Sequence, residues 1–287
     1  MAAKPPSRFR VAVCQLDVRH DKRENLARAR ELVHRAARRG AELVALPEMF
    51  VCPYAAELFP RYAESYPGGE ALQMLSQAAR EERLYLVGGS IPEREGDRFY
   101  NASFVFDPEG KLIARHRKVH LFDVDLPGGF SFRESATLSA GSGPTVFPTA
   151  LGTIGVAICF DIRFPAFFRE MARRGAEVIV IPGAFNMITG PAHWELLLRA
   201  RAVDNQLYTV GAAPARNPAA PYVAFGHSMV VSPWAEVIAR AGPEETILTA
   251  EIDREYLRSI RQKLPLAAEK SAAEGCSGDR NGKGNGV

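Results

Sequence analysis

The stretch IGVAICFDIRFP, residues 154–165, decides how the rest of the chain is interpreted. Its first five residues are mostly apolar and predict a buried strand, and the apolar run stops at Cys159. The polar residues Asp161 and Arg163 follow, and Pro165 stands where the first turn of a helix accepts proline. We therefore expect a sharp strand-to-helix turn with Cys159 at its corner. Such a corner exposes a nucleophile and directs the following backbone N–H groups at the atom that it attacks.

A cysteine after an apolar run is more often an inert, buried side chain, so other residues must support a catalytic role for Cys159. Glu48 follows the run LVALP at residues 43–47, and Lys118 follows a strand predicted over residues 112–116. Each of these two charges could be a solvated surface group. In an α/β fold, however, strand ends converge on one rim, where sites are built. The coincidence of three such residues favours a catalytic cluster.

Length and composition are those of an average globular protein. The chain has 287 residues, of which 47% are hydrophobic and 24% are charged, with a net charge of +3. This charge gives no indication of a nucleic acid or a membrane surface as a partner, and no apolar run approaches the roughly 20 residues of a membrane span. Residues 1–10 lack the apolar core of a secretory signal. We therefore expect a cytoplasmic protein.

The cysteines give no evidence for a metal centre or a disulfide framework. They are far apart in the sequence and lack C-x-x-C spacing: Cys14, Cys52, Cys159 and Cys276. Neither a zinc site nor a disulfide framework is indicated, and a reducing compartment is the default expectation.

Strands that alternate with helices, interspersed with hairpins, predict an α/β fold with mixed sheets covered by helices. No linker of changed composition interrupts this pattern, so one domain is expected over residues 9–266. Residues 267–287 have almost no apolar side chains and predict a disordered tail. Strands are expected over residues 9–16, 42–46, 84–87, 99–106, 111–116, 145–147, 154–158, 177–181, 207–212, 228–231, 237–239 and 247–252, and helices over 21–39, about 72–79, 165–174 and 192–204.

Three segments resemble the signature segments of the nitrilase, or carbon–nitrogen hydrolase, superfamily. They are LPEMF at residues 46–50, RKVHLF at residues 117–122, and residues 155–165. The resemblance covers roughly residues 9–264. It implies an α-β-β-α sandwich, and a homodimer in which two such protomers pair as α-β-β-α-α-β-β-α.

Later segments are similar to the omega-amidase branch of that superfamily: PGAFN at residues 182–186, GPAHWE at 190–195, RAVDNQ at 201–206 and GHS at 226–228. The branch implies hydrolysis of the terminal amide of α-ketoglutaramate and α-ketosuccinamate to the 2-oxo acid and ammonia, through a cysteine thioester. The resemblance therefore implies a small amide substrate and water as the partners, and chemistry that needs neither metal nor cofactor. Two alternatives stay open within the superfamily: an N-carbamoyl amine or acid hydrolase, and an amidase of another small acid. A nitrile substrate is less favoured. From a different class, a catalytically silent binding module of the same fold is the competing interpretation.

The residue types suggest a role for each group. Glu48 as a carboxylate can take the proton of Cys159 and later return it to ammonia, and the Lys118 ammonium lowers the cost of the thiolate and of the oxyanion. The backbone N–H of Phe160 can complete the oxyanion site. The resemblance adds Glu134, which matches the family's second glutamate and would hold Lys118 and the amide nitrogen in place.

The residues that bind the substrate are less well defined by the sequence. A substrate carboxylate needs a cationic anchor, for which Arg163 is the candidate, although a pairing with Asp161 is an equal alternative. Tyr54 and Phe185 are candidates for lining the pocket, or for the core. Residues 123–130 resemble a mobile cover, or a plain surface turn.

Several polar residues nearby are interpreted as structural. Arg199 and Arg201 are expected to be solvated, or paired with Asp204 or Glu195, and His193, Trp194 and His227 are expected not to form a cysteine–histidine dyad. Ala235 stands where the family usually has glycine, so we expect local strain if the backbone there has positive φ.

Overall fold

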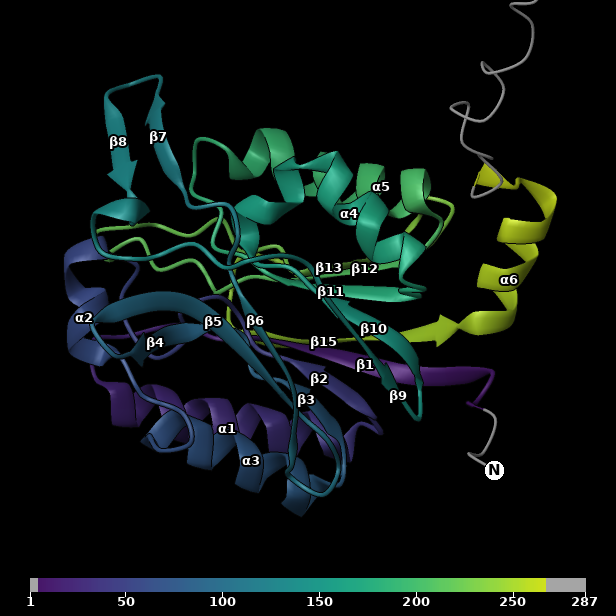
Figure 1. The fold of residues 1–287 in the computed structure, drawn as a ribbon, viewed down its shortest axis with the longest axis horizontal. Coiled ribbons are helices and arrows are strands. Elements are labelled where there is room, and N and C mark those ends of the chain that lie inside the picture. Colours follow the sequence, from purple (N-terminus) through teal and green to yellow (C-terminus); the bar gives the residue numbers. More distant parts are fainter. Residues whose placement is uncertain (1–4, 267–287) are drawn as a thin grey trace, which may run out of the picture.

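Two sheets lie face to face between two layers of helices in the computed structural model, which describes residues 5–266 (Figure 1). The strands of the first sheet are ordered β15 (Thr246–Asp253), β1 (Arg8–Gln15), β2 (Leu43–Ala45), β3 (Tyr85–Val87), β5 (Arg98–Phe106) and β4 (Ile91–Glu95), with β6 (Leu112–Arg117) paired to β5. Those of the second are ordered β14 (Val237–Arg240), β13 (Met229–Val231), β12 (Tyr208–Ala212), β11 (Val178–Pro182), β10 (Gly152–Val156) and β9 (Thr145–Thr149).

The helices cover the outer face of each sheet. The first sheet carries α1 (Lys22–Arg38) and α3 (Glu70–Glu82), and the second carries α4 (Pro165–Arg173) and α5 (Gly190–Asn205) (Figure 1). The predicted α-β-β-α sandwich is therefore confirmed. The pairing of two such protomers stays a prediction, and the tail predicted for residues 267–287 lies outside the described residues.

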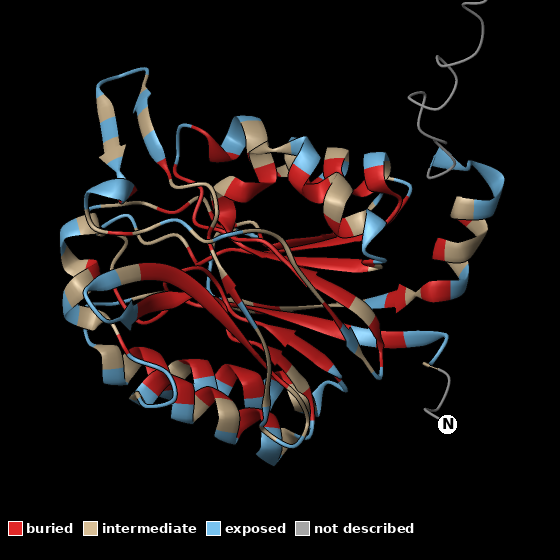
Figure 2. Cartoon of the chain, in the orientation of Figure 1, coloured by how far each residue is buried: buried red, intermediate tan, exposed pale blue. Residues whose placement is uncertain are grey.

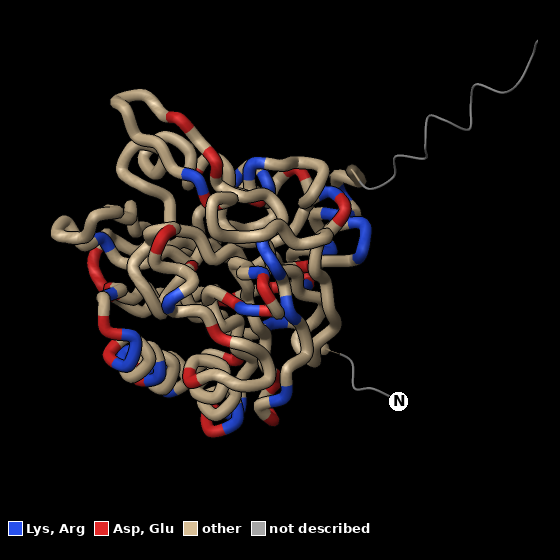
Figure 3. The backbone as a smooth tube through the Cα atoms, turned by 60° about the vertical axis from the view of Figure 1, so that its left-hand side comes forward, with Lys and Arg blue, Asp and Glu red and all other residues tan. Residues whose placement is uncertain are grey.

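The strands alternate between two cores because successive side chains of a strand point to opposite faces. In β1, Ala12 and Cys14 pack with the apolar faces of α1 and α3, whereas Val11 and Val13 pack in the core between the sheets. Figure 2 shows this burial as red inner faces of both sheets and of the helices against them. Charges of both signs are interspersed over the fold (Figure 3).

Some elements were not expected from the sequence. They are β4, α2 (Phe59–Tyr62), the two-stranded sheet of β7 (Asp123–Leu126) and β8 (Phe130–Arg133), α6 (Arg254–Lys263), and the short 3₁₀ turns η1 (Ala56–Leu58), η2 (Glu134–Ala136) and η3 (Cys159–Arg163). The β7–β8 hairpin projects from the body of the molecule beside the helical layer of α4 and α5 (Figure 1). Within residues 5–266, no helix is both long and apolar enough to cross a membrane.

The parallel strands of both sheets bring several loops to one edge. β1, β2 and β3 pair in parallel in the first sheet, and β10, β11 and β12 do so in the second. The carboxyl ends of parallel strands lie at the same edge of a sheet. Glu48 follows β2, and Cys159 and Ala184 follow β10 and β11, so these residues come from two sheets to one place.

Candidate active site

Three charged side chains that the sequence singled out meet in the interior. The Nζ atom of Lys118 lies 3.0 Å from Oε1 of Glu48 and 2.8 Å from Oε2 of Glu134, and all three side chains are fully buried. Glu134 begins η2, and its Oε2 also accepts a hydrogen bond of 2.7 Å from the backbone N–H of Phe122. Two carboxylates therefore share one ammonium, which brings together Glu48, Lys118 and Glu134.

Cys159 lies at the corner between β10 and α4, as expected. Its φ is 46°, a left-handed conformation that is rare for residues other than glycine and that often marks a functional site. β10 ends at Val156, two residues earlier than expected, and η3 begins at Cys159 itself. The cysteine is thus held at a tight turn next to the buried charges.

Burial changes the expected state of this thiol. Burial raises the pKa of Cys159 well above its ordinary value, the negative charge of Glu48 raises it further, and the charge of Lys118 lowers it only in part. The negative charge of Glu134 also raises the pKa of Cys159. The ammonium lowers the cost of a thiolate, as expected, but the resting group is a thiol beside a carboxylate base.

Glu48 is held by groups that the sequence did not single out. Its Oε1 accepts a hydrogen bond of 2.8 Å from Nδ2 of Asn101, and its Oε2 accepts one of 2.8 Å from the backbone N–H of Ala184. The hydroxyl of Tyr54 lies 3.3 Å from Oε1 of the same carboxylate. Tyr54 therefore contacts the charged cluster, whereas the sequence identified it only as a possible lining residue.

Asp161 does not pair with Arg163, and that alternative is wrong. Its carboxylate lies 3.1 Å from Nε2 of His116 and 2.8 Å from Nδ1 of His120, and it accepts hydrogen bonds from the backbone N–H groups of Ile158, Val119 and His120. Burial alone would raise the pKa of Asp161, but the bonds from both histidines outweigh it and hold the pKa well below its usual range.

The carboxylate of Asp161 connects the segment that carries Cys159 to the segment that carries Lys118. It follows Cys159 by two residues, and its histidine partners stand two residues before and after Lys118. The two histidines at equal spacing around Lys118 were a visible signal in the sequence, although β6 ends at Arg117 and residues 119–120 form a bend.

Arg163 lies close to the aromatic candidates. Its guanidinium carbon is 5.1 Å from the ring centre of Phe185 and 5.5 Å from that of Phe160. Its two terminal nitrogens each lie 3.3 Å from Nδ1 of His193. The charge of the half-buried guanidinium is therefore not neutralised by Asp161.

The other polar residues of α5 make structural contacts. Arg199 lies 3.4 Å from Glu195, as expected. Arg201 is buried rather than solvated, because its Nε donates to the carbonyl of Ile162 at 2.8 Å, and it lies 3.6 Å from Asp204. The indole of the buried Trp194 donates to the carbonyl of His227 at 2.9 Å, and the Nδ1 atom of that histidine lies 3.1 Å from the carbonyl of Ala241.

An aromatic cluster links Tyr54 of the site to β8 of the β7–β8 hairpin. The ring of Tyr54 lies 4.6 Å from that of Tyr222 and 5.4 Å from that of Phe132, measured between ring centres. Phe130 lies 6.1 Å from Tyr222. The sequence missed Tyr222, whose hydroxyl donates to the carbonyl of Ala184. Residues 123–130, expected as a cover or a plain turn, belong to this hairpin.

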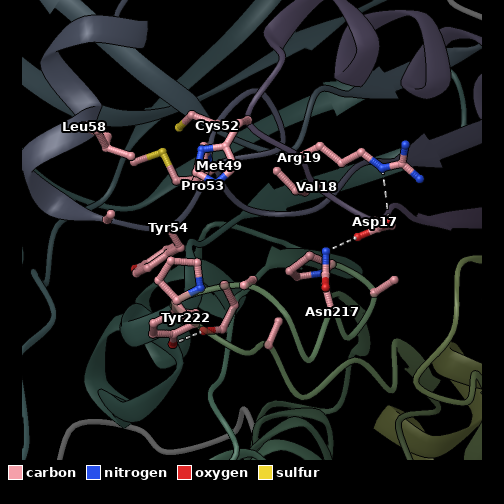
Figure 4. A pocket seen from close by; sticks show the side chains of 18 of the residues that line it. Asp17, Val18, Arg19, Met49, Cys52, Pro53, Tyr54, Leu58, Asn217 and Tyr222 are labelled. Atoms are coloured by element: carbon pink, nitrogen blue, oxygen red, sulfur yellow. Dashed lines mark hydrogen bonds and ion pairs between the residues drawn. The ribbon is translucent and has the colours of Figure 1, made fainter.

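A cavity of about 710 Å³ opens beside the buried charges (Figure 4). Glu48, Tyr54 and Tyr222 contribute to its wall, and Asp17 and Asn217 line its other end. Cys159 and Lys118 are not among its lining residues, so the cavity reaches the site at Glu48. Over residues 5–266, no group of three or more His, Cys, Asp or Glu side chains is arranged to hold a metal ion.

Comparison with known proteins places the chain in a family. The family described as Carbon-nitrogen hydrolase matches residues 10–262. The chain belongs to the carbon–nitrogen hydrolase family. A relative from Xenopus tropicalis described as omega-amidase NIT2 is 52% identical over 264 residues, which cover 92% of this chain and 95% of that protein.

Solved structures share the fold. Nit3 of Saccharomyces cerevisiae, described as a member of branch 10 of the nitrilase superfamily, has a TM-score of 0.86 at 42% identity, over 94% of this chain and 100% of that one. A mutant of the amidase from Nesterenkonia sp. AN1, with acrylamide added at its active-site cysteine, has a TM-score of 0.73 at 26% identity, over 90% of this chain and 98% of that one.

Proposed function

We propose that this protein is an omega-amidase, which hydrolyses the terminal amide of a 2-oxo dicarboxylic acid monoamide to the 2-oxo acid and ammonia. α-Ketoglutaramate and α-ketosuccinamate are the expected substrates. The relative at 52% identity described as an omega-amidase supports the proposal. The observation that carries it is the buried contact of Lys118 with Glu48 and Glu134 beside the corner at Cys159.

In the first half of the reaction, Glu48 takes the thiol proton as the sulfur of Cys159 attacks the amide carbon. Because the pKa of the thiol is raised, this proton transfer accompanies the attack rather than preceding it. The Lys118 ammonium and the backbone N–H of Phe160 stabilise the negative oxygen of the tetrahedral intermediate. Glu48 then returns the proton to the nitrogen, and the C–N bond breaks. Ammonia departs, and the acyl group remains bound to the sulfur of Cys159 as a thioester.

In the second half, water attacks the thioester. Glu48 accepts a proton from this water, a second tetrahedral intermediate forms at the same oxyanion site, and the sulfur of Cys159 leaves with that proton to restore the thiol. The 2-oxo acid is released. The same carboxylate therefore serves both halves, which explains why it needs rigid support.

Lys118 must stay cationic through both halves of the reaction, and the neighbouring carboxylates keep it protonated. Burial alone would lower the pKa of Lys118, but the negative charges of Glu134 and Glu48 outweigh burial and raise it above the ordinary value of 10.5. Glu134 holds the ammonium in place through the contact of 2.8 Å between its Oε2 and Nζ of Lys118.

The substrate carboxylate is anchored by Arg163 in this proposal. The guanidinium is half-buried, lies near the rings of Phe160 and Phe185, and has a histidine rather than a carboxylate beside it. A carboxylate can therefore accept its hydrogen bonds in a fork geometry. Tyr54 lines the cavity and would face the carbon chain, whereas Phe185 is buried beside Arg163 and is not among the residues that line the cavity.

Ammonia release from a panel of substrates tests the proposal. We expect turnover of α-ketoglutaramate by the wild type, and none by Cys159→Ala or Glu48→Gln. Turnover of N-carbamoyl amines or acids in place of any ω-amide would favour the other hydrolase. If neither class is turned over, the silent binding module is the better interpretation, and intact-mass spectrometry would then show no acyl adduct on Cys159.

We further propose that the protein works in the cytoplasm. We also propose that two copies pair into a homodimer through the layers formed by α4 and α5. Three large apolar side chains near α5 are exposed: Leu196 by 63%, Trp234 by 52% and Ile238 by 41%. They lie on adjoining elements, because Arg199 of α5 donates to the carbonyl of Ala235 at 3.0 Å. Exposed apolar side chains that adjoin one another favour a protein partner.

A further inference from the structure

We propose that Asn101 is a positioning residue of this hydrolysis, which holds Glu48 and Glu134 around Lys118 by donating one amide N–H to each carboxylate. The inference deepens the proposed function and rests on it. Asn101 lies in β5, and its side chain is fully buried. None of the sequence patterns that located the other site residues singles it out.

The contacts of Asn101 reach every group of the buried cluster except the sulfur. Its Nδ2 lies 2.8 Å from Oε1 of Glu48 and 3.1 Å from Oε1 of Glu134. Its backbone carbonyl accepts a hydrogen bond of 2.8 Å from the backbone N–H of Lys118. One residue therefore fixes both carboxylates and the start of the segment that carries the ammonium.

The chemistry of the amide determines which way the side chain faces. An amide nitrogen carries two N–H donors, and an ionised carboxylate only accepts. With the amide reversed, Oδ1 of Asn101 would face the oxygens of Glu48 and Glu134, and three acceptors would repel one another. Oδ1 has no hydrogen-bond partner among residues 5–266, so the donor end alone accounts for the position of the side chain.

The two carboxylates need such a neutral donor because a single ammonium cannot balance both. Glu48 and Glu134 carry up to two negative charges around the one positive charge of Lys118, in an interior where charges interact more strongly than in water. A second cation would cancel the charge of the base, whereas a neutral amide stabilises both carboxylates without adding charge. The single nitrogen Nδ2 of Asn101 is within hydrogen-bond distance of an oxygen of Glu48 and of an oxygen of Glu134.

The same contacts determine which oxygen of Glu48 takes the thiol proton. A carboxylate oxygen offers about two lone pairs. Those of Oε1 are used, because three donors approach it: Nδ2 of Asn101 at 2.8 Å, Nζ of Lys118 at 3.0 Å and the hydroxyl of Tyr54 at 3.3 Å. Oε2 accepts only from the backbone N–H of Ala184 among these groups, and so keeps a lone pair for the proton of Cys159. Asn101 thus orients the base as well as placing it.

Two substitutions test the proposal, with a control on the same strand. Asn101→Leu keeps the approximate volume and removes both donors, and we expect kcat to fall about 100-fold with KM changed less than about threefold, because a small misplacement of catalytic groups costs about that factor. Ser103→Ala is the matched control. Ser103 lies two residues along β5 on the same face, is fully buried, and its hydroxyl has no partner among residues 5–266.

Asn101→Asp gives a result that a purely structural role would not produce. At neutral pH the new carboxyl replaces the donor with an acceptor, so activity should be lost. As the pH falls and the new carboxyl gains a proton, it can donate again, and we expect partial recovery of kcat that the Leu variant does not show. The charged and titratable groups around it are those of the site: Glu48, Glu134, Lys118, Cys159, Tyr54 and Tyr222.

The outcomes separate this inference from the proposed function. If the wild type turns over no ω-amide, the proposed function fails, and the inference is then tested without substrate by the rate at which iodoacetamide alkylates Cys159, measured by mass spectrometry. We expect this rate to change at least tenfold in Asn101→Leu and to stay unchanged in Ser103→Ala. A kcat or alkylation rate in Asn101→Leu within threefold of the wild type overturns the inference, as does an equal loss in Ser103→Ala. If Asn101→Leu does not fold, absence of low-pH recovery in Asn101→Asp overturns it.

Discussion

At the scale of single residues, the site depends on charges whose protonation states are set by burial. The Cys159 thiol and the Lys118 ammonium both have a raised pKa, and so has the carboxyl of Glu134 because of its burial. The ammonium and the thiol are therefore in the states that the proposed reaction needs at neutral pH, without a preformed thiolate.

The pH profile of kcat/KM should reflect these shifts. A raised pKa keeps a thiol or an ammonium protonated to higher pH, so neither Cys159 nor Lys118 should cause a fall in activity between pH 7 and the ordinary thiol value of 9.0. A raised pKa makes Glu134 take up its proton above the ordinary value of 4.5, so the acidic limb should lie above that pH. A steep loss of kcat/KM between pH 7 and 9 would contradict this assignment.

Asp161 should be required for both activity and stability. In Asp161→Asn, an amide that must donate as well as accept replaces a carboxylate that accepts from two histidines and from the backbone N–H of Ile158. We expect unfolding in urea to show a loss of about 3 kcal/mol, and kcat to fall about 100-fold. Asp204→Asn on the surface of α5 is the control, and should change neither quantity appreciably.

Ala235 should be a site where glycine is more stable. Its φ is 63°, so the strain that the sequence suggested is present in the backbone. Ala235→Gly removes the clash of Cβ in the left-handed conformation, and we expect a gain of about 0.5–1 kcal/mol after the greater flexibility of unfolded glycine is subtracted. Thermal unfolding should then shift upward by roughly 2 °C. A lower Tm would show that Cβ makes a favourable contact there.

The sequence predicted the charged residues of the site better than their supports. Glu48, Lys118 and Cys159 each follow a strand, and strand ends are visible as breaks in apolar runs. Asn101 lies inside a strand, and Tyr222 lies in a loop far from the other site residues in the sequence. Their contacts exist only when distant strands pair, so no local pattern of one sequence indicates them.

At the scale of elements, the β7–β8 hairpin shows an alternation that was overlooked. Phe130 and Phe132 are half-buried toward Tyr222 and Tyr54, whereas Ser131 is exposed. The glycines at the tip drew attention to a turn, but the flanking residues are a short strand pair. The other missed elements, β4 and α6, carry many charges, which masked their apolar faces.

Shortening an aromatic side chain of this hairpin should weaken substrate binding. Phe132 contacts Tyr54 and Tyr222, with ring centres 5.4 and 6.2 Å away. Each aromatic pair contributes about 1 kcal/mol, so we expect Phe132→Ala to raise KM roughly tenfold while kcat changes less. Steady-state kinetics with Ser131→Ala as the exposed control would decide. An unchanged KM would mean that the hairpin does not cover the site.

At the scale of the whole molecule, the periodic patterns predicted mixed sheets covered by helices and most of the long elements, but not β4, α2, β7, β8 or α6. The position of the sheets relative to each other was implied only by the resemblance. The assembly is likewise a proposal, and it depends on the exposed apolar side chains near α5.

The proposed dimer should dissociate when this apolar face becomes charged. Leu196→Asp places a carboxylate in the surface formed with Trp234 and Ile238, and burying it in a dimer would be costly. Sedimentation velocity should show a dimer for the wild type and a monomer for the variant. Leu264→Asp, at a side chain exposed by 42% near the end of α6, is the control and should stay dimeric. A monomeric wild type would exclude the proposed pairing.

The two sheets contribute different halves of the catalytic machinery. Glu48, Asn101 and Lys118 belong to the first sheet and its loops, whereas Cys159 and Ala184 follow strands of the second. The rate of hydrolysis should therefore depend strongly on the distance between the two sheets. In a low concentration of denaturant, a displacement of one sheet relative to the other by about an ångström should abolish activity. The circular dichroism spectrum should still be that of the native protein under the same conditions.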